Sequence, residues 1–427
     1  MIKRCPGTQG VETPHGSPPR LRVALISVHA SPLAVLGGKD AGGMNLYVRE
    51  LSRQLGDLDV AVDVFTHWRD CSQPQIVPLG PRARVVHLQA GPIAHLDKHA
   101  LERDLPEFSY QLLRFREAQG LRYDLLHSHY WLSGRVAMWL SQHWHIPHVT
   151  MFHTLGEAKN RARLGEREHT ARIESERRII AAVDRIVAGS AQEKQLMIRV
   201  YDARPHRVTV IPPGVDLTQF RPGSQAAARR ELGLGRGKVV LFVGRLEPLK
   251  GIDILLQALP RIEHRGPVRL LVAGGDAQGD PERARLERLA TDLGIADRVT
   301  FLGPVDHDRL PALYRAADVC VVPSYYESFG LVAVEALACG TPVIASRVGG
   351  LIGTVADGET GFLVPWRCPE PFAERLELLL GNDALRAQFA AAAPGSVARF
   401  GWAGVARQVL DLYDDLAPSD RAQALGS

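Results

Sequence analysis

Two cations and two carboxylates in the second half of the chain have the types and spacing of a ligand site. Arg245 and Lys250 stand in the string G-R-L-E-P-L-K-G, and Glu327 and Glu335 bracket the string S-F-G-L-V-A-V. Fixed cations hold a diphosphate and neutralise the charge that develops when it leaves. Carboxylates accept hydrogen bonds from sugar hydroxyls. The four residues together are suited to a nucleotide sugar.

The same residues have a plainer explanation, in which the cations are solvated and the glutamates lie on an ordinary helix. Glu335, however, follows the apolar residues Leu331, Val332 and Val334, where a carboxylate without a partner would be costly. A turn at Gly330 would also direct the backbone N–H groups of Gly330 and Leu331 into a cleft. We therefore expect this segment to contact the ligand.

A glycine-rich segment at 36–45, L-G-G-K-D-A-G-G-M-N, follows the first expected strand. Glycines let backbone N–H groups approach a phosphate, and the N-terminus of the following helix adds a favourable field. The segment is neither a G-x-G-x-x-G motif nor a Walker loop, because Lys39 is followed by Asp40. This pattern disfavours a dehydrogenase or a nucleoside triphosphatase, and a flexible loop is the alternative.

Several histidines gather in one stretch of the first half. They are His127, His129, His143, His145, His148 and His153. The first two share one face of a strand, but no Asp, Glu or Cys joins them at a spacing typical of metal ligands, so no metal site is expected. His153 differs, because it follows a strand end in M-F-H-T-L-G and should face the cleft. There it could hydrogen-bond a sugar hydroxyl or a carbonyl.

These residues must be positioned by an α/β framework that runs through both halves of the chain. Strands are expected at 21–28, 60–65, 85–88, 124–127, 147–152, 185–188, 208–211, 238–243, 268–273, 298–301, 318–322, 342–346 and 361–364. A helix is expected at 44–56, and an amphipathic helix at 400–413. The alternation predicts two Rossmann-like domains whose parallel sheets face each other across a ligand-binding cleft.

The Pro-rich segment 212–222 is the expected linker between the two domains. The predicted organisation is a disordered leader at 1–20, an acceptor-binding domain at 21–211, a nucleotide-sugar-binding domain at 223–399, a helix at 400–416 that crosses back to the first domain, and a loose tail at 417–427. The leader is rich in Pro, Gly and Thr and lacks the apolar centre of a signal peptide. No apolar run approaches the roughly eighteen residues needed to span a bilayer.

Composition favours a cytoplasmic protein with small-molecule partners. The five Cys are scattered, at 5, 71, 320, 339 and 368, and none forms a C-x-x-C motif, which is typical of a reducing compartment. The net charge of +4 is small, and no basic run is interleaved with aromatic residues. Nucleic acid is therefore not an expected partner.

From about residue 21 to residue 416 the chain resembles family-four retaining glycosyltransferases, which have the GT-B fold. G-R-L-E-P-L-K-G and E-S-F-G-L-V-A-V-E-A are typical of the whole family, and D-A-G-G-M-N with H-S-H-Y-W-L-S-G marks a narrower group. Other shared strings are I-S-V-H-A-S-P-L, F-H-T-L, E-S-E-R-R, Y-R-A-A-D and G-T-P-V-I-A. The narrower group includes enzymes of mycothiol synthesis that glycosylate an inositol phosphate, and relatives of sucrose-phosphate synthase.

The resemblance implies a role for each matching residue. In the donor site, Arg245 and Lys250 would hold the diphosphate, Gly43 would contact a phosphate, Glu335 would bind the ribose, Glu327 and His153 would position the sugar, and Gly330 and Leu331 would line the site. In the acceptor site, Lys98, Tyr130, Thr154 and Arg177 would bind a phosphate, and His29, Asp40 and Asn45 would lie beside the acceptor ring. Departures from the family pattern at 30–39 and 161–167 leave the identity of that ring open.

The implied reaction is a retaining transfer of N-acetylglucosamine from UDP-N-acetylglucosamine to 1D-myo-inositol 3-phosphate. The UDP-sugar is a co-substrate, and no metal cofactor is expected, although Mg²⁺ without a catalytic role is compatible with the scheme. Alternatives are a sucrose-phosphate-synthase-like transferase with another nucleotide sugar and sugar phosphate, a non-catalytic sugar-nucleotide-binding protein, and a nucleotide-sugar epimerase. Whether the chain forms a homodimer is left open.

Overall fold

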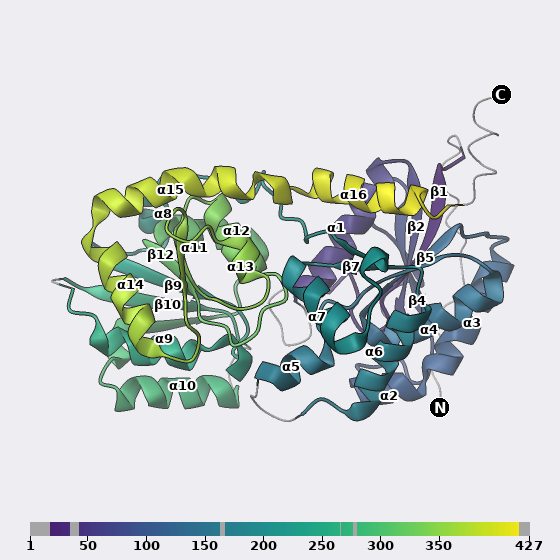
Figure 1. Ribbon diagram of the computed structural model, residues 1–427, viewed down its shortest axis with the longest axis horizontal. Coiled ribbons are helices and arrows are strands. Elements are labelled where there is room, and N and C mark those ends of the chain that lie inside the picture. The colour runs from purple at the N-terminus through teal and green to yellow at the C-terminus, as the bar shows by residue number, and fades with distance from the viewer. Residues whose placement is uncertain (1–17, 35–41, 163–166, 265, 276–279, 418–427) are drawn as a thin grey trace.

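Each half of the chain folds around one parallel sheet with helices on both faces, and the two halves form two lobes (Figure 1). The structure is a computed structural model that describes residues 18–34, 42–162, 167–264, 266–275 and 280–417. The strands are short runs rich in Val, Leu and Ile, as expected where both faces of a parallel sheet are buried.

The first sheet has eight strands in the order β3-β4-β2-β1-β5-β6-β7-β8. Its strands are β1 (Leu21–Ile26), β2 (Val60–His67), β3 (Ile76–Pro78), β4 (Ala83–Leu88), β5 (Leu125–His129), β6 (His148–Met151), β7 (Arg185–Ala188) and β8 (Val208–Val210). Its helices are α1 (Gly43–Asp57), α2 (Lys98–Arg103), α3 (Leu105–Ala118), α4 (Tyr130–Trp144), α5 (Gly156–Ala162), α6 (Thr170–Ala182) and α7 (Ala191–Tyr201). All pairings are parallel except that of β3 with β4.

The second sheet has six strands in the order β11-β10-β9-β12-β13-β14, and every pairing is parallel. Its strands are β9 (Lys238–Val243), β10 (Val268–Ala273), β11 (Val299–Gly303), β12 (Val319–Val322), β13 (Val343–Ser346) and β14 (Gly361–Val364). Its helices are α8 (Gln225–Glu231), α9 (Ile252–Ala258), α10 (Pro281–Asp292), α11 (Leu310–Ala316), α12 (Leu331–Ala338), α13 (Leu351–Thr354), α14 (Pro369–Gly381) and α15 (Asp383–Val397). Short 3₁₀ turns are η1 (Pro205–Arg207), η2 (Pro248–Lys250), η3 (Leu259–Arg261), η4 (Ala296–Arg298), η5 (His307–Arg309) and η6 (Ala398–Phe400).

The strand order reverses direction once in each sheet, between β1 and β5 in the first and between β9 and β12 in the second. In open α/β sheets, ligands bind beyond the carboxyl ends of the strands at such a point, because the flanking connections leave in opposite directions and open a crevice. The segments that follow these four strands carry most of the residues singled out from the sequence. The topology therefore brings the two sets of residues to facing edges.

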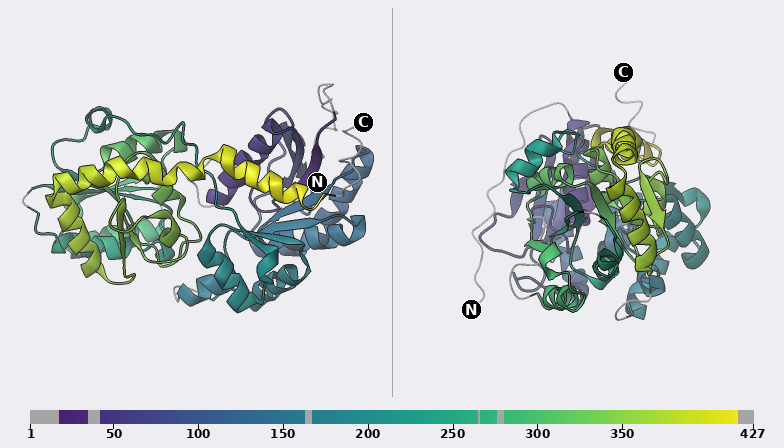
Figure 2. Two further views of the ribbon diagram at one scale, coloured as in Figure 1. Left: turned by 45° about the horizontal axis from the view of Figure 1, so that its top comes forward. Right: turned by 90° about the vertical axis from the view of Figure 1, so that its left-hand side faces the viewer.

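The last helix, α16 (Trp402–Asp414), crosses from the second lobe back to the first (Figures 1 and 2). It packs against α1, and its Val405, Val409 and Leu412 belong to the core cluster on one face of the first sheet. The apolar residues recur every three or four positions, which gives the helix one face to bury. This confirms the crossover helix expected from the sequence.

Every expected strand is present, and the predicted fold class is confirmed. One strand, β3, was not expected from the sequence. It is a three-residue antiparallel edge strand with little apolar pattern. We propose 212–222 as the domain boundary, since β8 ends at Val210 and β9 begins at Lys238. The expected leader and tail lie almost entirely outside the described residues. Within the described part of the chain, no helix combines the length and apolar character needed to cross a membrane.

Candidate active site

Lys250 and Glu327 meet at the carboxyl ends of β9 and β12. Lys250 Nζ donates to Glu327 Oε2 at 2.6 Å, and both side chains are partly exposed. The turn that ends at Gly251 makes this possible: its φ is 66°, and a Cβ there would come within 2.1 Å of the Pro323 carbonyl oxygen. Only glycine allows this close approach without strain. The two loops are thereby held together, with a cation and a carboxylate at their tip.

Arg245 follows β9 directly and is half exposed. Its guanidinium pairs with Glu247, two residues along the same loop. An arginine that is held only by an exposed neighbour can turn to a phosphate, because a surface ion pair contributes little. The expected diphosphate cation is therefore available at the edge of the cleft.

The N-termini of α1 and α12 face each other across the cleft. Gly43, the first residue of α1, lies so close to α12 that an added Cβ would be 3.0 Å from Leu331 Cδ1. Gly330 precedes α12 as its N-cap. The unpaired N–H groups of a helix N-terminus favour an anion. The two termini thus lie near Lys250, through its bond to Glu327, and we propose that the expected diphosphate binds here.

Glu335 is buried one turn into α12 and is held by two neighbours. Tyr314 donates its hydroxyl to Glu335 Oε2 at 2.8 Å, and His307 Nε2 lies 3.2 Å from Glu335 Oε1. Burial and the Glu335 charge raise the pKa of Tyr314 well above its usual value, so the phenol stays a donor. The sequence did not identify either partner. Tyr314 begins the shared string Y-R-A-A-D, to which no role was assigned, and His307 lies outside the shared strings.

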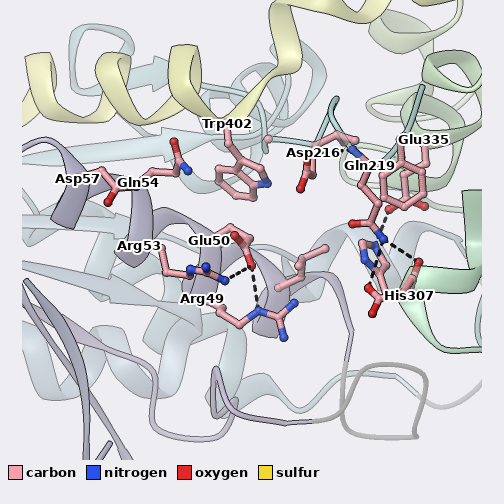
Figure 3. A pocket seen from close by; sticks show the side chains of 15 residues that line it. Arg49, Glu50, Arg53, Gln54, Asp57, Asp216, Gln219, His307, Glu335 and Trp402 are labelled. Carbon is pink, nitrogen blue, oxygen red and sulfur yellow. Dashed lines mark hydrogen bonds and ion pairs between the residues drawn. The ribbon is translucent and has the colours of Figure 1, made fainter. Parts of the chain in front are cut away.

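Glu335 lines a cavity of about 330 Å³ between the lobes. Figure 3 shows Glu335 and His307 on one side of it, with Arg49 and Glu50 of α1 on the other. The cavity continues past Trp402 of the crossover helix. Its lining is mostly polar, and it extends along α1 as far as Asp57, so of the residues expected in the donor site Glu335 is the one that lines it.

His153 follows β6 with a left-handed backbone, at φ 60°. Its Nε2 lies 2.9 Å from Nδ1 of His129, the last residue of β5. His127, two residues earlier, has its Nδ1 2.6 Å from the Tyr413 hydroxyl of α16. Burial lowers the pKa of His153 and of His127 to about 3, so both rings are neutral. His129 is thus the hydrogen-bond partner that fixes the ring of His153, while His127 bonds separately to Tyr413 and its ring lies 4.4 Å from that of His129.

A cationic cradle lies at the opposite edge of the cleft, around the ring of Tyr130. Lys98 Nζ is 5.2 Å from that ring and the Arg172 guanidinium is 4.9 Å from it. Arg172 Nη2 donates to the carbonyl oxygen of Thr154 at 2.9 Å and to its hydroxyl at 3.2 Å. Two cations and two hydroxyls are therefore gathered from four segments, a set of donors suited to a phosphate.

Arg172 is fixed by two carboxylates of its own lobe. Its Nε donates to Glu176 at 2.8 Å, and its Nη1 lies 2.9 Å from Glu168, which also pairs with Lys159 at 2.8 Å. The Arg172 side chain is 4% exposed. Burial alone lowers its pKa, but the Tyr130 oxygen and the carboxylates of Glu176 and Glu168 outweigh that effect and raise it. The guanidinium is thus charged and held in place.

Arg177, which was expected in this cradle, has other partners in the structure. Arg177 lies on the exposed side of α6, where its Nη1 donates to the Val200 carbonyl at 2.8 Å and its guanidinium covers the Tyr201 ring. Arg172, five residues earlier on the same helix, occupies the expected position. The sequence held one signal for it, since Arg172 and Glu176 are spaced as a helical ion pair.

Lys98 is influenced by both lobes. Burial is the largest cause that lowers its pKa, followed by the charge of Arg172, and the charge of Arg245 across the cleft adds to the effect. Glu168 and Glu247 oppose it. The acceptor and donor cations are therefore close enough to act on one another.

The residues expected beside the acceptor ring have different surroundings. The His29 ring lies 4.4 Å from the Tyr130 ring at an interplanar angle of 42°, and burial together with Lys98 lowers the pKa of His29 well below its usual value. Asn45 is buried, and its side-chain amide forms hydrogen bonds inside the protein. It donates to the Ser31 carbonyl at 2.9 Å and accepts from the Gly42 N–H at 3.0 Å. Asp40 lies outside the described residues. Of these three, His29 alone is placed against the cradle by a contact that the structure describes.

No three His, Cys, Asp or Glu side chains lie close enough to hold a metal ion within the described ranges. The histidines considered for such a site are occupied by one another and by Tyr413.

Comparison with known proteins gives matches along almost the whole chain. Residues 224–395 match the family described as "Glycosyl transferases group 1", and residues 41–219 match "Glycosyltransferase Family 4". The D-inositol 3-phosphate glycosyltransferase 2 of Catenulispora acidiphila is 47% identical over 402 residues, which are 92% of this chain and 94% of that protein. The D-inositol 3-phosphate glycosyltransferase of Frankia alni is 45% identical over 90% of this chain and 97% of that protein.

Among solved structures, the sucrose-phosphate synthase from Thermosynechococcus elongatus is similar with a TM-score of 0.86 and 37% identity. The match covers 93% of this chain and 99% of that one.

Proposed function

Since this chain belongs to the family-four glycosyltransferases, we propose that it moves a sugar from a nucleotide diphosphate to a phosphorylated polyol with retention of anomeric configuration. The preferred pair of substrates is UDP-N-acetylglucosamine and 1D-myo-inositol 3-phosphate. The names of the two relatives that are 47% and 45% identical to this chain support the acceptor. The donor sugar follows from the resemblance of the motifs.

One observation carries the proposal: the cleft holds two cationic sites that face each other. Arg245 and Lys250 lie with two helix N-termini on one edge, and Lys98 and Arg172 lie on the other. The first site suits a leaving diphosphate and the second suits a phosphate that stays on the acceptor. A protein that only bound a nucleotide sugar would not need the second site.

The proposed course of the reaction is the one that the family resemblance implies, with the residues of this cleft in its roles. The acceptor phosphate, held by Lys98, Tyr130, Thr154 and Arg172, orients the ring so that one hydroxyl points at the anomeric carbon, which lowers the entropic part of the barrier. The bond from that carbon to the diphosphate oxygen breaks, and Lys250 with Arg245 stabilises the charge that develops there. The acceptor oxygen attacks from the face that the diphosphate leaves. Its proton passes to a phosphate oxygen of the leaving group.

Glu327 and His153 are proposed to hold the transferred sugar. Glu327 lies beside the diphosphate site through its bond to Lys250, and His153 is neutral and fixed by His129. A carboxylate next to a sugar that gains positive charge stabilises the transition state more than the ground state. Glu327→Gln should therefore lower kcat while UDP affinity stays within about threefold of wild type, as measured by calorimetry.

The test is to incubate the pure protein with a panel of UDP-sugars and other nucleotide sugars, each with inositol 3-phosphate or a hexose phosphate. The product is identified by mass and its anomeric configuration by NMR. N-acetylglucosaminyl inositol phosphate with an α-linkage is the expected product. No product with any phosphorylated acceptor would contradict the proposal.

A second candidate is a sucrose-phosphate-synthase-like transferase. It is favoured by the 37% identity and the TM-score of 0.86 to the cyanobacterial enzyme. A product formed only with a hexose phosphate would select it. Conversion of the nucleotide sugar with no acceptor present would instead select an epimerase.

A further inference from the structure

The loop that carries Glu327 reaches across the cleft into the first lobe. Tyr326, the residue before Glu327, packs its ring against the hydrophobic cluster of the first sheet. Ser328, the residue after Glu327, accepts a hydrogen bond from the Ser190 hydroxyl at 3.0 Å, and Ser190 caps α7 of the first lobe. Both sequence neighbours of the proposed sugar-binding carboxylate are therefore held by the opposite lobe.

A second cavity, of about 270 Å³, lies at this contact. Ala158 of α5 and Leu196 of α7 line it from the first lobe, and Tyr326, Glu327 and Trp366 line it from the second. Because neither lobe supplies all of its walls, the cavity exists only when the lobes are in contact.

Arg367 adds a second tie at the same place. Its guanidinium donates to the carbonyl of Ala162 at the end of α5, and it covers the Trp366 ring at 3.9 Å. The Arg367 backbone is left-handed, with φ 72°, a conformation that is uncommon for a residue other than glycine and that the surrounding contacts must hold. The contact between the lobes thus involves two loops of the second lobe.

Glu327 itself is held by its own lobe. Its carbonyl accepts from the Gly350 N–H at 3.0 Å, and its carboxylate is bonded to Lys250 at 2.6 Å. The backbone of residue 327 is fixed in the second lobe, while residues 326 and 328 are fixed in the first. Separation of the lobes would therefore release the loop on both sides of this carboxylate.

We propose that Tyr326 is a positioning residue, whose ring, seated in the first lobe, sets Glu327 against the transferred sugar when the two lobes are in contact. The inference rests on the proposed function, which assigns Glu327 to that sugar. Glu327 would then be correctly placed against the sugar only when the acceptor-binding lobe contacts this loop. A shift of about 1 Å in a positioned group costs on the order of 100-fold in rate, so a single ring contact is sufficient for the effect.

The test is a double-mutant cycle between Tyr326 and Glu327. Tyr326→Ala should lower kcat at least about tenfold in the wild-type background, with UDP affinity within about threefold. In the Glu327→Gln background the same substitution should lower kcat by less than about threefold, because it acts through the carboxylate that is already absent. Tyr326→Phe should recover most of the activity, since it keeps the ring that packs against the first lobe.

Tyr110→Ala provides a matched control, because Tyr110 is an exposed tyrosine on α3. It should change neither kcat nor UDP affinity. If Tyr326→Ala does not fold, Tyr326→Leu and Ser190→Ala enter the same cycle in its place.

An equal loss of kcat in both backgrounds would overturn the inference, as would weaker UDP binding with unchanged kcat. Those failures differ from a failure of the proposed function, in which the wild-type protein itself forms no product with phosphorylated acceptors.

Discussion

The two cationic sites of the cleft are built differently. On the donor edge, Lys250 and Arg245 are 24% and 48% exposed, and each is paired with a carboxylate of its own loop or a neighbouring loop. On the acceptor edge, Arg172 is 4% exposed and is bonded to Glu176, which is fully buried. A diphosphate that arrives on the donor edge must replace the existing partners of the cations. On the acceptor edge, Arg172 is already set before the ligand binds, whereas Lys98 is exposed.

The difference follows from what each edge must do. The donor diphosphate changes its charge during the reaction, so cations that can shift toward it contribute most in the transition state. The acceptor phosphate does not react. A rigid cradle is sufficient there, because its role is to hold one hydroxyl at a fixed place.

The largest expected effect is that of Arg172→Ala. It removes the central cation of the cradle and leaves Glu176 buried without its partner, which costs about 3–5 kcal/mol in buried pairs. We expect kcat/KM for the phosphorylated acceptor to fall at least about 100-fold and the melting temperature to fall with it. Arg172→Lys, which keeps the charge but loses the fork of donors, should fold better and still bind the acceptor weakly. A kcat/KM for the phosphorylated acceptor within threefold of the wild-type value would show that the cradle does not bind the acceptor.

Lys250→Ala and Arg245→Ala should each lower kcat/KM at least about tenfold, because they remove charge-assisted contacts to the leaving diphosphate. Their melting temperatures should stay close to that of wild type, since these cations are exposed enough for their ion pairs to contribute little. Arg245→Lys should also lose activity, because a point charge does not replace a bidentate fork. A large loss of stability without loss of rate would reverse the contrast between the two edges.

Lys98→Ala should raise the acceptor KM about five- to thirtyfold, on the order of 1–2 kcal/mol for one charge-assisted contact, with little change in donor KM. Burial lowers the pKa of Lys98, so its charge is present at low pH and is lost as the pH rises through that lowered pKa. The acceptor KM of the wild type should therefore rise at alkaline pH. Lys98→Arg is the control, since arginine keeps its charge and should move this rise out of the measured range. An acceptor KM with the same pH profile in both proteins would exclude Lys98 as its cause.

The smallest expected effect is that of Arg177→Ala, which should change kcat/KM less than about twofold, as is usual for an exposed residue away from the site. Arg172 and Arg177 form a matched pair on one helix, so the two variants compare the same chemistry at two positions. Arg177 lies in the shared string E-S-E-R-R, from which it was expected to bind the acceptor phosphate. A steep rise in acceptor KM for Arg177→Ala would support that assignment and would mean that the cradle around Tyr130 is not the acceptor site.

The donor edge was predictable because its residues lie in contiguous strings. Arg245 and Lys250 share one loop, and Glu327 and Glu335 share one turn and helix. The acceptor edge collects residues from four segments, and there the structure places Arg172 against Tyr130 and Thr154, where Arg177 was expected. Five residues along an α-helix turn by about 500°, which places Arg177 some 140° away from Arg172 around α6. The motif alone does not show which of these two angular positions around the helix faces the cleft.

The fold was predictable from the alternation of buried strands and helices, down to the crossover helix. The contacts between the lobes were not. Tyr326 and Arg367 act on the opposite lobe, and the partners of their side chains, the core cluster of the first sheet and Ala162, are distant in sequence. Such contacts depend on how two finished surfaces meet, and no local periodicity records them.

The most direct test of the central claim compares inositol 3-phosphate with free myo-inositol as acceptors for UDP-N-acetylglucosamine. Product formation is followed by mass, and kcat/KM is measured for each acceptor in the wild type and in Arg172→Lys. A phosphate held by two cations predicts a preference of at least about 100-fold for the phosphorylated acceptor in the wild type. The preference should shrink in the variant. Equal use of both acceptors by the wild type would contradict the account of two facing anion sites.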